Sequence, residues 1–312
     1  MSTKNSTGLW TAEPHTLAKI EILKAYLFRW FEMLGSRVQK NLWYIDGFAG
    51  PGEYTNSATG SPVVAISSAN EALCKLGDKW KAGHIHCVFM EQSKGALQHL
   101  QSKLTDITDN SRIKKHFFNS TFVDGLFALK KRSPNPFSIL SNSPPLFVFI
   151  DPFGAEGISF YSVSYLLSRP TSELLINLDS DGIGRIFSAK EAENHEPILN
   201  EIFGDKSWKE ELTKYRTSYN LYRGVLELYK KKLRALPKVR YVFAFEMCSA
   251  NNSINYHLVF ASQHPRGLQK MKECMKGKGT VAPVNDGEGF YFDPNTNSIR
   301  ITDALLFETG KA

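Results

Sequence analysis

The chain has 312 residues, of which 42% are hydrophobic, and a formal net charge of +7. This length and composition allow a full buried core, so we expect one large domain, or one domain with an insertion. No apolar run approaches the roughly 18 residues of a membrane helix, and the first sixteen residues lack the apolar core of a secretory signal. The four cysteines form no CxxC pair, which argues against a zinc knuckle or iron–sulfur motif and favours reduced thiols in a cytoplasmic protein.

Helical and strand patterns alternate through the first 180 residues. Apolar residues at helical spacing predict a helix over 16–34, and helices are also expected at about 61–76 and at 93–104. The apolar run 42–45 reads as a strand buried on both faces, and it leads into a Gly-Pro-Gly turn. Further strands are expected at 84–91, 113–119, 144–154 and 173–179. Strands that alternate with helices predict an α/β fold with a mostly parallel sheet.

The second half of the chain carries a different pattern. Residues 185–237 are rich in helix formers and lack a strand pattern, so we expect a basic helical insertion there. Residues 240–249 and 256–263 predict an antiparallel hairpin around Asn251-Asn252, followed by a short helix at 267–275. We therefore predict a Rossmann-like core over 1–184 and 238–278 with an N-terminal helix, the insertion at 185–237, and a C-terminal extension at 279–312.

Acids and amides end four of the predicted strands: Asp46, Glu91, Asn119 and Asp151. In an open α/β sheet, ligands bind beyond the carboxyl ends of the strands. Gly50 and Gly52 allow a sharp turn and a close approach of the backbone to a ligand. A carboxylate at the end of the second strand is placed to accept hydrogen bonds from two ribose hydroxyls. The sequence therefore predicts a nucleoside-containing cofactor.

The glycine order argues against two common phosphate-binding motifs. Residues 47–52 read G-x-x-G-x-G, whereas the dinucleotide fingerprint is G-x-G-x-x-G. The P-loop string G-x-x-x-x-G-K-[ST] does not occur in the chain. Both observations weaken the hypothesis that the turn cradles a nucleotide phosphate.

An acid, two glycines two residues apart, and an acid at the end of the next strand resemble the class I S-adenosylmethionine-dependent methyltransferases, whose sheet carries an antiparallel last strand. The resemblance implies S-adenosylmethionine as the cofactor. Its methionine part would lie against Asp46, Phe48, Gly50 and Gly52, its ribose against Glu91, and its adenine near Asn119. His15 and Lys19, four residues apart at the start of the first helix, are further candidates to contact the cofactor carboxylate or a nucleic-acid phosphate. The alternative is a helix cap followed by a solvated lysine.

The string Asp151-Pro152-Phe153-Gly154 resembles the fourth motif of methyltransferases that modify base nitrogens, D/N/S-P-P-Y/F, in a variant similar to that of tRNA guanine-N2 methyltransferases. Phe153 stands where many members have a second proline. The resemblance implies that the Asp151 carboxylate and the Pro152 carbonyl accept the N–H bonds of a base amine, which returns the lone pair to the nitrogen, and that Phe153 stacks on the base. The alternative is a strand-ending turn with Phe153 in the core.

Across nearly its full length the chain also resembles the three-Cys-motif partner (TcmP) family of bacterial proteins. The strings that carry this resemblance are LWTAEPHTLAKIEILKAYLFRWF (9–31), YIDGFAGPGEY (44–54), GSP (60–62), FIDPFG (149–154) and YHLVFASQHPRG (256–267). The resemblance implies a methyltransferase-like fold and a neighbouring protein that carries the cysteines as a partner. It implies no established substrate.

Positive charge is concentrated between Gly204 and Arg240, where eleven Lys and Arg stand against four Asp and Glu. The tyrosines among these bases are Tyr215, Tyr219, Tyr222 and Tyr229. Basic residues interleaved with aromatic residues suit a phosphate backbone with exposed nucleobases, and the alternative is a solvated helix face with buried tyrosines.

His257 is expected to be a core histidine. Asp179 and Asp181 are expected to cap a helix and not to hold a metal, so no metal is predicted.

These observations lead to one functional prediction and two alternatives. We expect an enzyme, an N-methyltransferase that moves the methyl group of S-adenosylmethionine to a nucleobase nitrogen of DNA or RNA. The first alternative is a non-catalytic subunit of the same fold that binds nucleic acid or forms a complex. The second is a different chemistry, such as nucleoside hydrolysis, at the same cleft.

Overall fold

A computed structural model describes residues 9–107, 110–131, 143–189, 192–215, 221–248 and 254–276, and three short strands within 283–302. The chain divides into two compact units. Unit 1 comprises Met1–Phe149 and Gln269–Cys274, and unit 2 comprises Ile150–Leu268 and Met275–Ala312. The limits of these units differ from the limits that we predicted for the core, the insertion and the extension. The predicted limits therefore stay a prediction.

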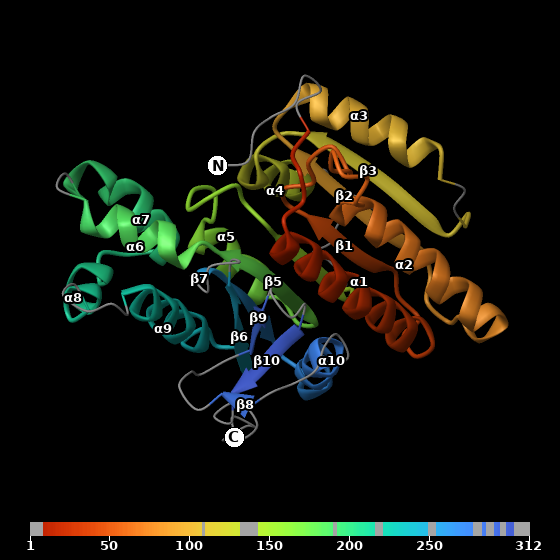
Figure 1. Ribbon diagram of the computed structural model, residues 1–312. Coiled ribbons are helices and arrows are strands. Elements are labelled where there is room, and N and C mark those ends of the chain that lie inside the picture. The colour runs from red at the N-terminus through yellow and green to blue at the C-terminus, as the bar shows by residue number, and fades with distance from the viewer. Residues whose placement is uncertain are drawn as a thin grey trace. The chain divides into compact units, whose positions relative to one another are not determined.

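The described strands of unit 1 are parallel and lie in the order β3-β2-β1-β4, and Figure 1 labels the first three of them. They span Leu42–Asp46 (β1), Ile85–Glu91 (β2), Ile113–Asn119 (β3) and Leu146–Ile150 (β4). Every residue of β1 is buried, which confirms the strand predicted to be covered on both faces. Since the strands are parallel, Asp46, Glu91 and Asn119 end their strands at the same edge of the sheet. This order matches the first four positions of the doubly wound order 3-2-1-4-5-6.

Helices accompany these strands in unit 1. They are α1 (Pro14–Gly35), α2 (Ser61–Leu76), the 3-10 turn η1 (Gly77–Lys79), α3 (Lys94–Thr105) and α4 (Phe122–Lys131). Helices α1 and α2 lie side by side (Figure 1). The first three α-helices confirm those predicted at 16–34, 61–76 and 93–104, whereas α4 was missed. Among the cysteines of this unit, Cys74 on α2 is exposed, while Cys87 and Cys274 are buried.

The strands of unit 2 contain the predicted antiparallel hairpin. β6 (Tyr241–Cys248) pairs antiparallel with β7 (Ile254–Ser262), and β7 also pairs antiparallel with β5 (Ser172–Leu178). The turn at Asn251-Asn252 lies outside the described residues. Strands β8 (Pro283–Val284), β9 (Phe290–Asp293) and β10 (Ser298–Thr302) add to β6 within the segment that we predicted only as an extension.

Between β5 and β6 the described residues of unit 2 form helices and no strand. These are α6 (Ser180–Ser188), η2 (Ala192–His195), α7 (Glu196–Phe203), α8 (Trp208–Thr213) and α9 (Leu221–Arg234). Helix α5 (Phe160–Leu167), which precedes β5, was missed, and α10 (Pro265–Lys276) confirms the last predicted helix. Parallel strands, a helical insertion and antiparallel strands that follow it confirm the predicted Rossmann-like α/β fold. No described helix is both long enough and apolar enough to cross a membrane.

Candidate functional site

Glu91 and the glycine turn are in direct contact at the carboxyl edge of unit 1. The Gly50 amide donates a 3.0 Å hydrogen bond to Oε2 of Glu91, and the Ser93 amide donates a 2.6 Å bond to Oε1. A carboxylate has about four lone-pair positions, so these two bonds leave acceptor positions for a ligand hydroxyl. The carboxylate thus both fixes the turn and can bind a ligand beside it.

The two turn glycines have different surroundings, although both have positive φ, +59° at Gly50 and +87° at Gly52. A Cβ at Gly50 would meet no atom within 4 Å, whereas one at Gly52 would lie 2.7 Å from Cδ1 of Leu100. Gly52 is therefore packed against α3, and Gly50 faces open space next to Glu91. A bound molecule could therefore approach the backbone at Gly50 without a clash.

The amide groups of the turn donate to acceptors within the protein. Phe48 N donates to Oδ1 of Asp46 (3.3 Å), Ala49 N donates to the Met90 carbonyl (2.9 Å), and Gly50 N donates to Glu91. Pro51 has no amide hydrogen. A phosphate cradle requires several amide hydrogens directed at the ligand. The turn from Phe48 to Pro51 offers none, which agrees with the missing phosphate motifs.

Asp46 and Asn119 hold the loops around the turn. Asp46 is fully buried, and its Oδ2 accepts a 3.1 Å hydrogen bond from the Tyr44 hydroxyl. The Asn119 amide donates to the carbonyls of Glu91 (3.0 Å) and Gln92 (2.9 Å). Both side chains therefore shape the site, and the Asn119 Oδ1 is the atom that could accept a bond from an adenine amine.

The segment before α1 is bonded to the loop that follows the glycine turn. Thr55 N donates to the Trp10 carbonyl (2.9 Å), Ala12 N donates to Oδ1 of Asn56 (3.3 Å), and Nδ2 of Asn56 donates back to the Ala12 carbonyl (3.1 Å). Sequence reasoning missed Asn56. His15 and Lys19 follow within the first two turns of α1, and Lys19 is buried.

Asp151, at the start of unit 2, is held by a residue that sequence reasoning did not find. Nδ2 of Asn177, on β5, donates a 2.7 Å hydrogen bond to Oδ1 of Asp151. Pro152 is buried, and the Phe153 side chain is 82% exposed. The alternative that placed Phe153 in the core is therefore wrong.

Asp179 caps α6, as predicted, and also borders the loop 151–154. Its Oδ1 accepts a 2.8 Å hydrogen bond from Gly182 N, and Asp181 pairs with Arg185 at 3.3 Å. A Cβ at Gly154 would lie 4.0 Å from Oδ2 of Asp179. Burial raises the pKa of the Asp179 carboxyl. In the described part of the chain, no three His, Cys, Asp or Glu side chains form a group that could hold a metal.

His257 is a buried core histidine, as predicted. Its Nδ1 lies 2.5 Å from the Ser180 hydroxyl and its Nε2 lies 3.7 Å from Oε1 of Glu246. Ser180 and His257 have no exposed surface, and burial lowers the pKa of the imidazole. The arrangement of Ser180, His257 and Glu246 resembles a serine nucleophile with its histidine base and an acid. However, Ser180 has no exposed surface, so a substrate cannot reach it. The three side chains form a structural network.

The basic stretch 204–240 is largely neutralised by its neighbours. Ten of its eleven cations are described, and seven of these form ion pairs: Lys206 and Lys209 with Glu196, Lys214 and Lys231 with Glu211, Lys230 with Glu227, Lys232 with Asp205, and Arg223 with Glu246. Tyr229 is fully buried. The alternative of a helix face with a buried tyrosine therefore holds for much of this stretch.

No family model matches the chain, and no curated protein shows significant similarity to it. Among solved structures, an O-methyltransferase from Bacillus cereus in complex with SAH is 13% identical, with 76% of this chain and 79% of that chain covered at a TM-score of 0.40. Trm1 from Pyrococcus horikoshii with S-adenosyl-L-methionine is 11% identical, with 96% and 68% covered at a TM-score of 0.39. A putative O-methyltransferase from Klebsiella pneumoniae is 10% identical, with 77% and 79% covered at 0.39. Likenesses of this size say nothing about substrate.

Proposed function

We propose that the protein is an S-adenosylmethionine-dependent methyltransferase. The observation that carries the proposal is the contact between Gly50 N and Glu91, in a turn whose amides are already engaged. A ligand of this turn should contain a ribose for the carboxylate but should not need a phosphate at the turn. S-adenosylmethionine has that chemistry, and it supplies a methyl group activated on a sulfonium.

The residues of unit 1 would hold this cofactor in distinct ways. Glu91 would accept hydrogen bonds from the ribose hydroxyls, and the open side of Gly50 would admit the methionine part. Asp46 would act indirectly, because it is buried and shapes the turn through Phe48. His15 and Lys19 remain candidates for the cofactor carboxylate.

We propose a nucleobase nitrogen of DNA or RNA as the acceptor of the methyl group. In support, Asp151 combines a fixed carboxylate with an exposed neighbouring aromatic ring, Phe153, on which a base could stack. Phe149 is paired with Asp46 in the parallel register of β1 and β4. Asp151 comes two residues after Phe149 in the sequence. A base within a duplex would first have to be flipped out.

The finer expectations from the sequence belong to the same proposal. They are membership of the bacterial TcmP family, a partner protein with the three-Cys motif, nucleic-acid binding through residues 204–240, and a cytoplasmic location. These expectations rest on the sequence strings and the charge distribution given above.

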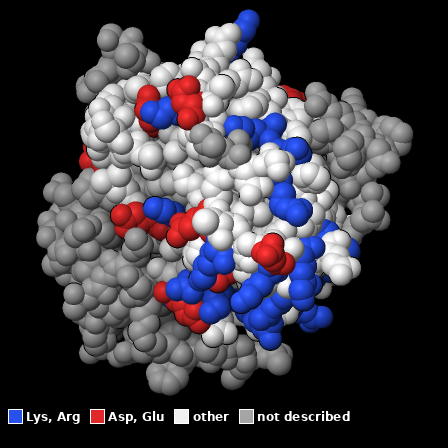
Figure 2. All heavy atoms as spheres, turned by 90° about the vertical axis from the view of Figure 1, so that its right-hand side faces the viewer, with Lys and Arg blue, Asp and Glu red and all other residues white. Residues whose placement is uncertain are grey.

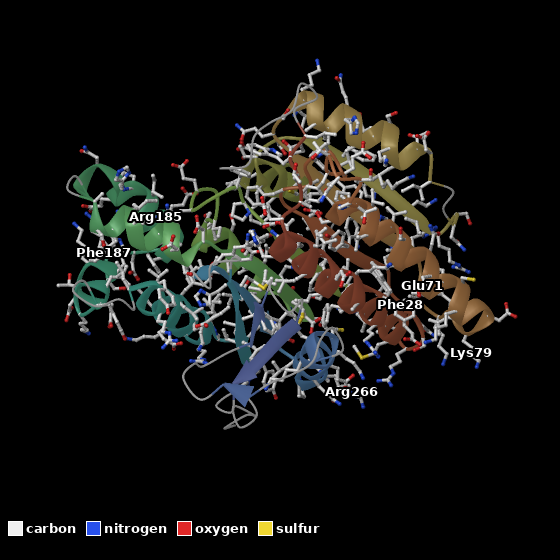
Figure 3. All side chains as sticks on the ribbon, viewed as in Figure 1. Phe28, Glu71, Lys79, Arg185, Phe187 and Arg266 are labelled. Carbon is white, nitrogen blue, oxygen red and sulfur yellow. The ribbon has the colours of Figure 1, made fainter. Side chains whose placement is uncertain are left out.

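Calorimetric titration with S-adenosylmethionine and S-adenosylhomocysteine tests the cofactor. We expect both to bind, and we expect Glu91→Ala to weaken binding by about 10- to 100-fold, as the loss of hydrogen bonds to a charged group would. Glu71→Ala, an exposed acid on α2 in the same unit, is the matched control and should bind like the unmodified protein (Figure 3). The absence of both heat and a thermal shift with either ligand would contradict the proposal.

Transfer of a radiolabelled methyl group to mixed RNA and DNA tests the reaction. Asp151→Ala should abolish transfer and leave cofactor affinity unchanged. Asp181→Ala, which removes a half-buried acid that pairs with Arg185 on α6, is the control and should transfer normally. Cofactor binding without transfer to either polymer would instead favour the non-catalytic subunit.

A further inference from the structure

The unpaired cations of the stretch 204–240 lie at its C-terminal end. Arg234, Lys238 and Arg240 are exposed and form no ion pair within the described part of the chain. The seven paired cations precede them in sequence. A cation that is already paired with a carboxylate attracts a phosphate less than an unpaired cation does. The net charge of residues 204–240 therefore does not show which of its cations could bind a phosphate.

A fourth exposed cation joins these three at the end of the β6–β7 pair. Arg240 N donates a 3.2 Å hydrogen bond to the Ser262 carbonyl, which brings the start of β6 against the end of β7. His264 N donates to the Ser262 hydroxyl (3.1 Å), and Arg266 N donates to Nδ1 of His264 (3.1 Å). Arg266 is thereby carried to the same end of the hairpin, at the start of α10 (Figure 3).

Within the residues that the structure describes, no acidic side chain forms an ion pair with any of these four cations. Glu173 is paired with Ser262 in the register of β5 and β7, but it is buried and accepts a 2.7 Å hydrogen bond from the Ser262 hydroxyl. We call the four exposed cations Arg234, Lys238, Arg240 and Arg266 the basic edge. The positive charges of the basic edge are therefore exposed to solvent and available to an anion.

We propose that the basic edge binds the phosphodiester backbone of the nucleic acid, and that the substrate is therefore a polymer that extends well beyond the target base. This inference rests on the proposed function and adds to it the surface and the minimum length of the substrate. The length follows from the position of the edge relative to Asp151 within unit 2.

Strand β5 sets that length. Asp151 is bonded to Asn177, and the basic edge adjoins Ser262, which is opposite Glu173. Asn177 lies four positions after Glu173 along β5, a distance of roughly 13 Å at about 3.3 Å per residue. One strand of a duplex advances about 3.4 Å per nucleotide, so the backbone would have to continue for at least about four nucleotides past the target.

A second exposed basic surface, in unit 1, is the alternative binding surface for the nucleic acid. Figure 2 shows Lys and Arg gathered in the lower part of the face that lies on the right of Figure 1. In unit 1, Arg37, Lys79 and Lys81 are exposed, and Lys81 N donates a 2.7 Å hydrogen bond to the Gly35 carbonyl at the end of α1. This surface adjoins the amino ends of β1 and β2, away from Glu91.

Three triple variants of the full chain, each lacking three positive charges, separate these surfaces. The edge variant is Arg234→Ala, Lys238→Ala and Arg240→Ala. The paired control is Lys209→Ala, Lys214→Ala and Lys231→Ala, and the rival variant is Arg37→Ala, Lys79→Ala and Lys81→Ala. None of these residues belongs to the cofactor site, so unchanged S-adenosylhomocysteine affinity and melting temperature show that each variant is folded.

The measurement is the salt dependence of fluorescence anisotropy with single-stranded RNA and DNA of about 20 nucleotides. We expect the slope of log affinity against log salt to fall by about 2 in the edge variant, because each phosphate contact on a single strand contributes about 0.7. The paired and rival variants should keep the slope of the unmodified protein. Oligonucleotides of about three nucleotides should bind weakly and should not distinguish the edge variant.

Three results would overturn the proposal: an equal loss of slope in the paired variant, a loss confined to the rival variant, or no binding of either polymer by the unmodified protein. Any of these with intact S-adenosylhomocysteine binding would leave the cofactor assignment standing. Equal binding of RNA and DNA would support recognition of phosphate alone, and tighter binding of RNA would add a contact to the 2′-hydroxyl.

Discussion

Asn177 holds the Asp151 carboxylate through a 2.7 Å hydrogen bond from its Nδ2 to Oδ1. The other amide atom, Oδ1 of Asn177, is buried and has no hydrogen-bond partner within the described residues. If the amide were turned over, two acceptor oxygens would face each other, so the observed orientation is the favourable one. The carboxylate is therefore fixed by a side chain from the neighbouring part of unit 2.

Asn177→Leu tests whether this bond positions Asp151. The substitution keeps a similar volume but removes the donor, and we expect methyl transfer to fall by about 10- to 100-fold, as for the loss of a hydrogen bond to a charged group. The affinity for S-adenosylhomocysteine should not change, because the cofactor residues belong to unit 1. A lower affinity with normal transfer would contradict the positioning role.

The two turn glycines should respond differently to alanine. Both have positive φ, which costs a non-glycine residue about 1–2 kcal/mol, but only Gly52 also faces a collision with Leu100. We expect Gly50→Ala to lower the free energy of unfolding by about 1–2 kcal/mol and Gly52→Ala by about 2–5 kcal/mol, measured in urea. The reverse order would show that the turn is packed differently.

His86 should make the protein sensitive to acid. Its ring is stacked on Trp43 at 4.1 Å and its Nδ1 lies 3.0 Å from Nε2 of His116. Burial, with the neighbouring charges of His116, His84 and Lys114, lowers its pKa from 6.5 to about 4. Between these two values the unfolded chain binds the proton and the folded chain does not, so stability is full above about pH 6.5 and falls as the pH falls.

By pH 5 this loss should reach about 2 kcal/mol for His86 alone. His257, whose pKa is also lowered by burial, adds a loss of the same sign. Urea unfolding of the unmodified protein and of His86→Phe from pH 8 to pH 5 measures the share of His86. The variant should lose less stability over this range, and parallel curves would exclude His86 as a source of the acid sensitivity.

Tyr229→Phe should stabilise the protein. The Tyr229 ring is fully buried, its hydroxyl has no hydrogen-bond partner among the described residues, and burial raises its pKa. Removing a buried unsatisfied hydroxyl should raise the free energy of unfolding by about 1 kcal/mol. Thermal unfolding measures the effect, and nucleic-acid binding should be unchanged. Weaker binding in this variant would restore the hypothesis that Tyr229 contacts bases.

The strands of unit 1 could be predicted because burial on both faces leaves a continuous apolar run, as in β1. Helix α4 was missed although Thr121 and Asp124 carry its start signal. Asp124 N donates to the Thr121 hydroxyl (3.1 Å), and that hydroxyl donates to the Asp124 carboxylate (2.8 Å). This is the [ST]-x-x-[DE] capping pattern, which was present in the sequence.

The candidate site was only partly predictable for a different reason. Asp46, Glu91 and Asn119 could be placed together because parallel strands end at one edge. Asn177 and Asn56 act through partners far away in sequence, and no spacing rule gives those pairs; a polar residue within the apolar strand 173–179 was the available signal for Asn177. The pairing of Lys209 with Glu196 likewise depends on how two helices meet, which net charge does not reveal.

The different environments of the cysteines give the protein a chemical handle. Cys74 is exposed on α2, whereas burial raises the pKa of the Cys274 thiol to about 11 and Cys87 is buried in β2. A maleimide dye should therefore attach at Cys74 in preference to these two, because the thiolate is the reactive form. Energy transfer from that dye to a labelled oligonucleotide would then report the direction in which the strand runs across the folded chain.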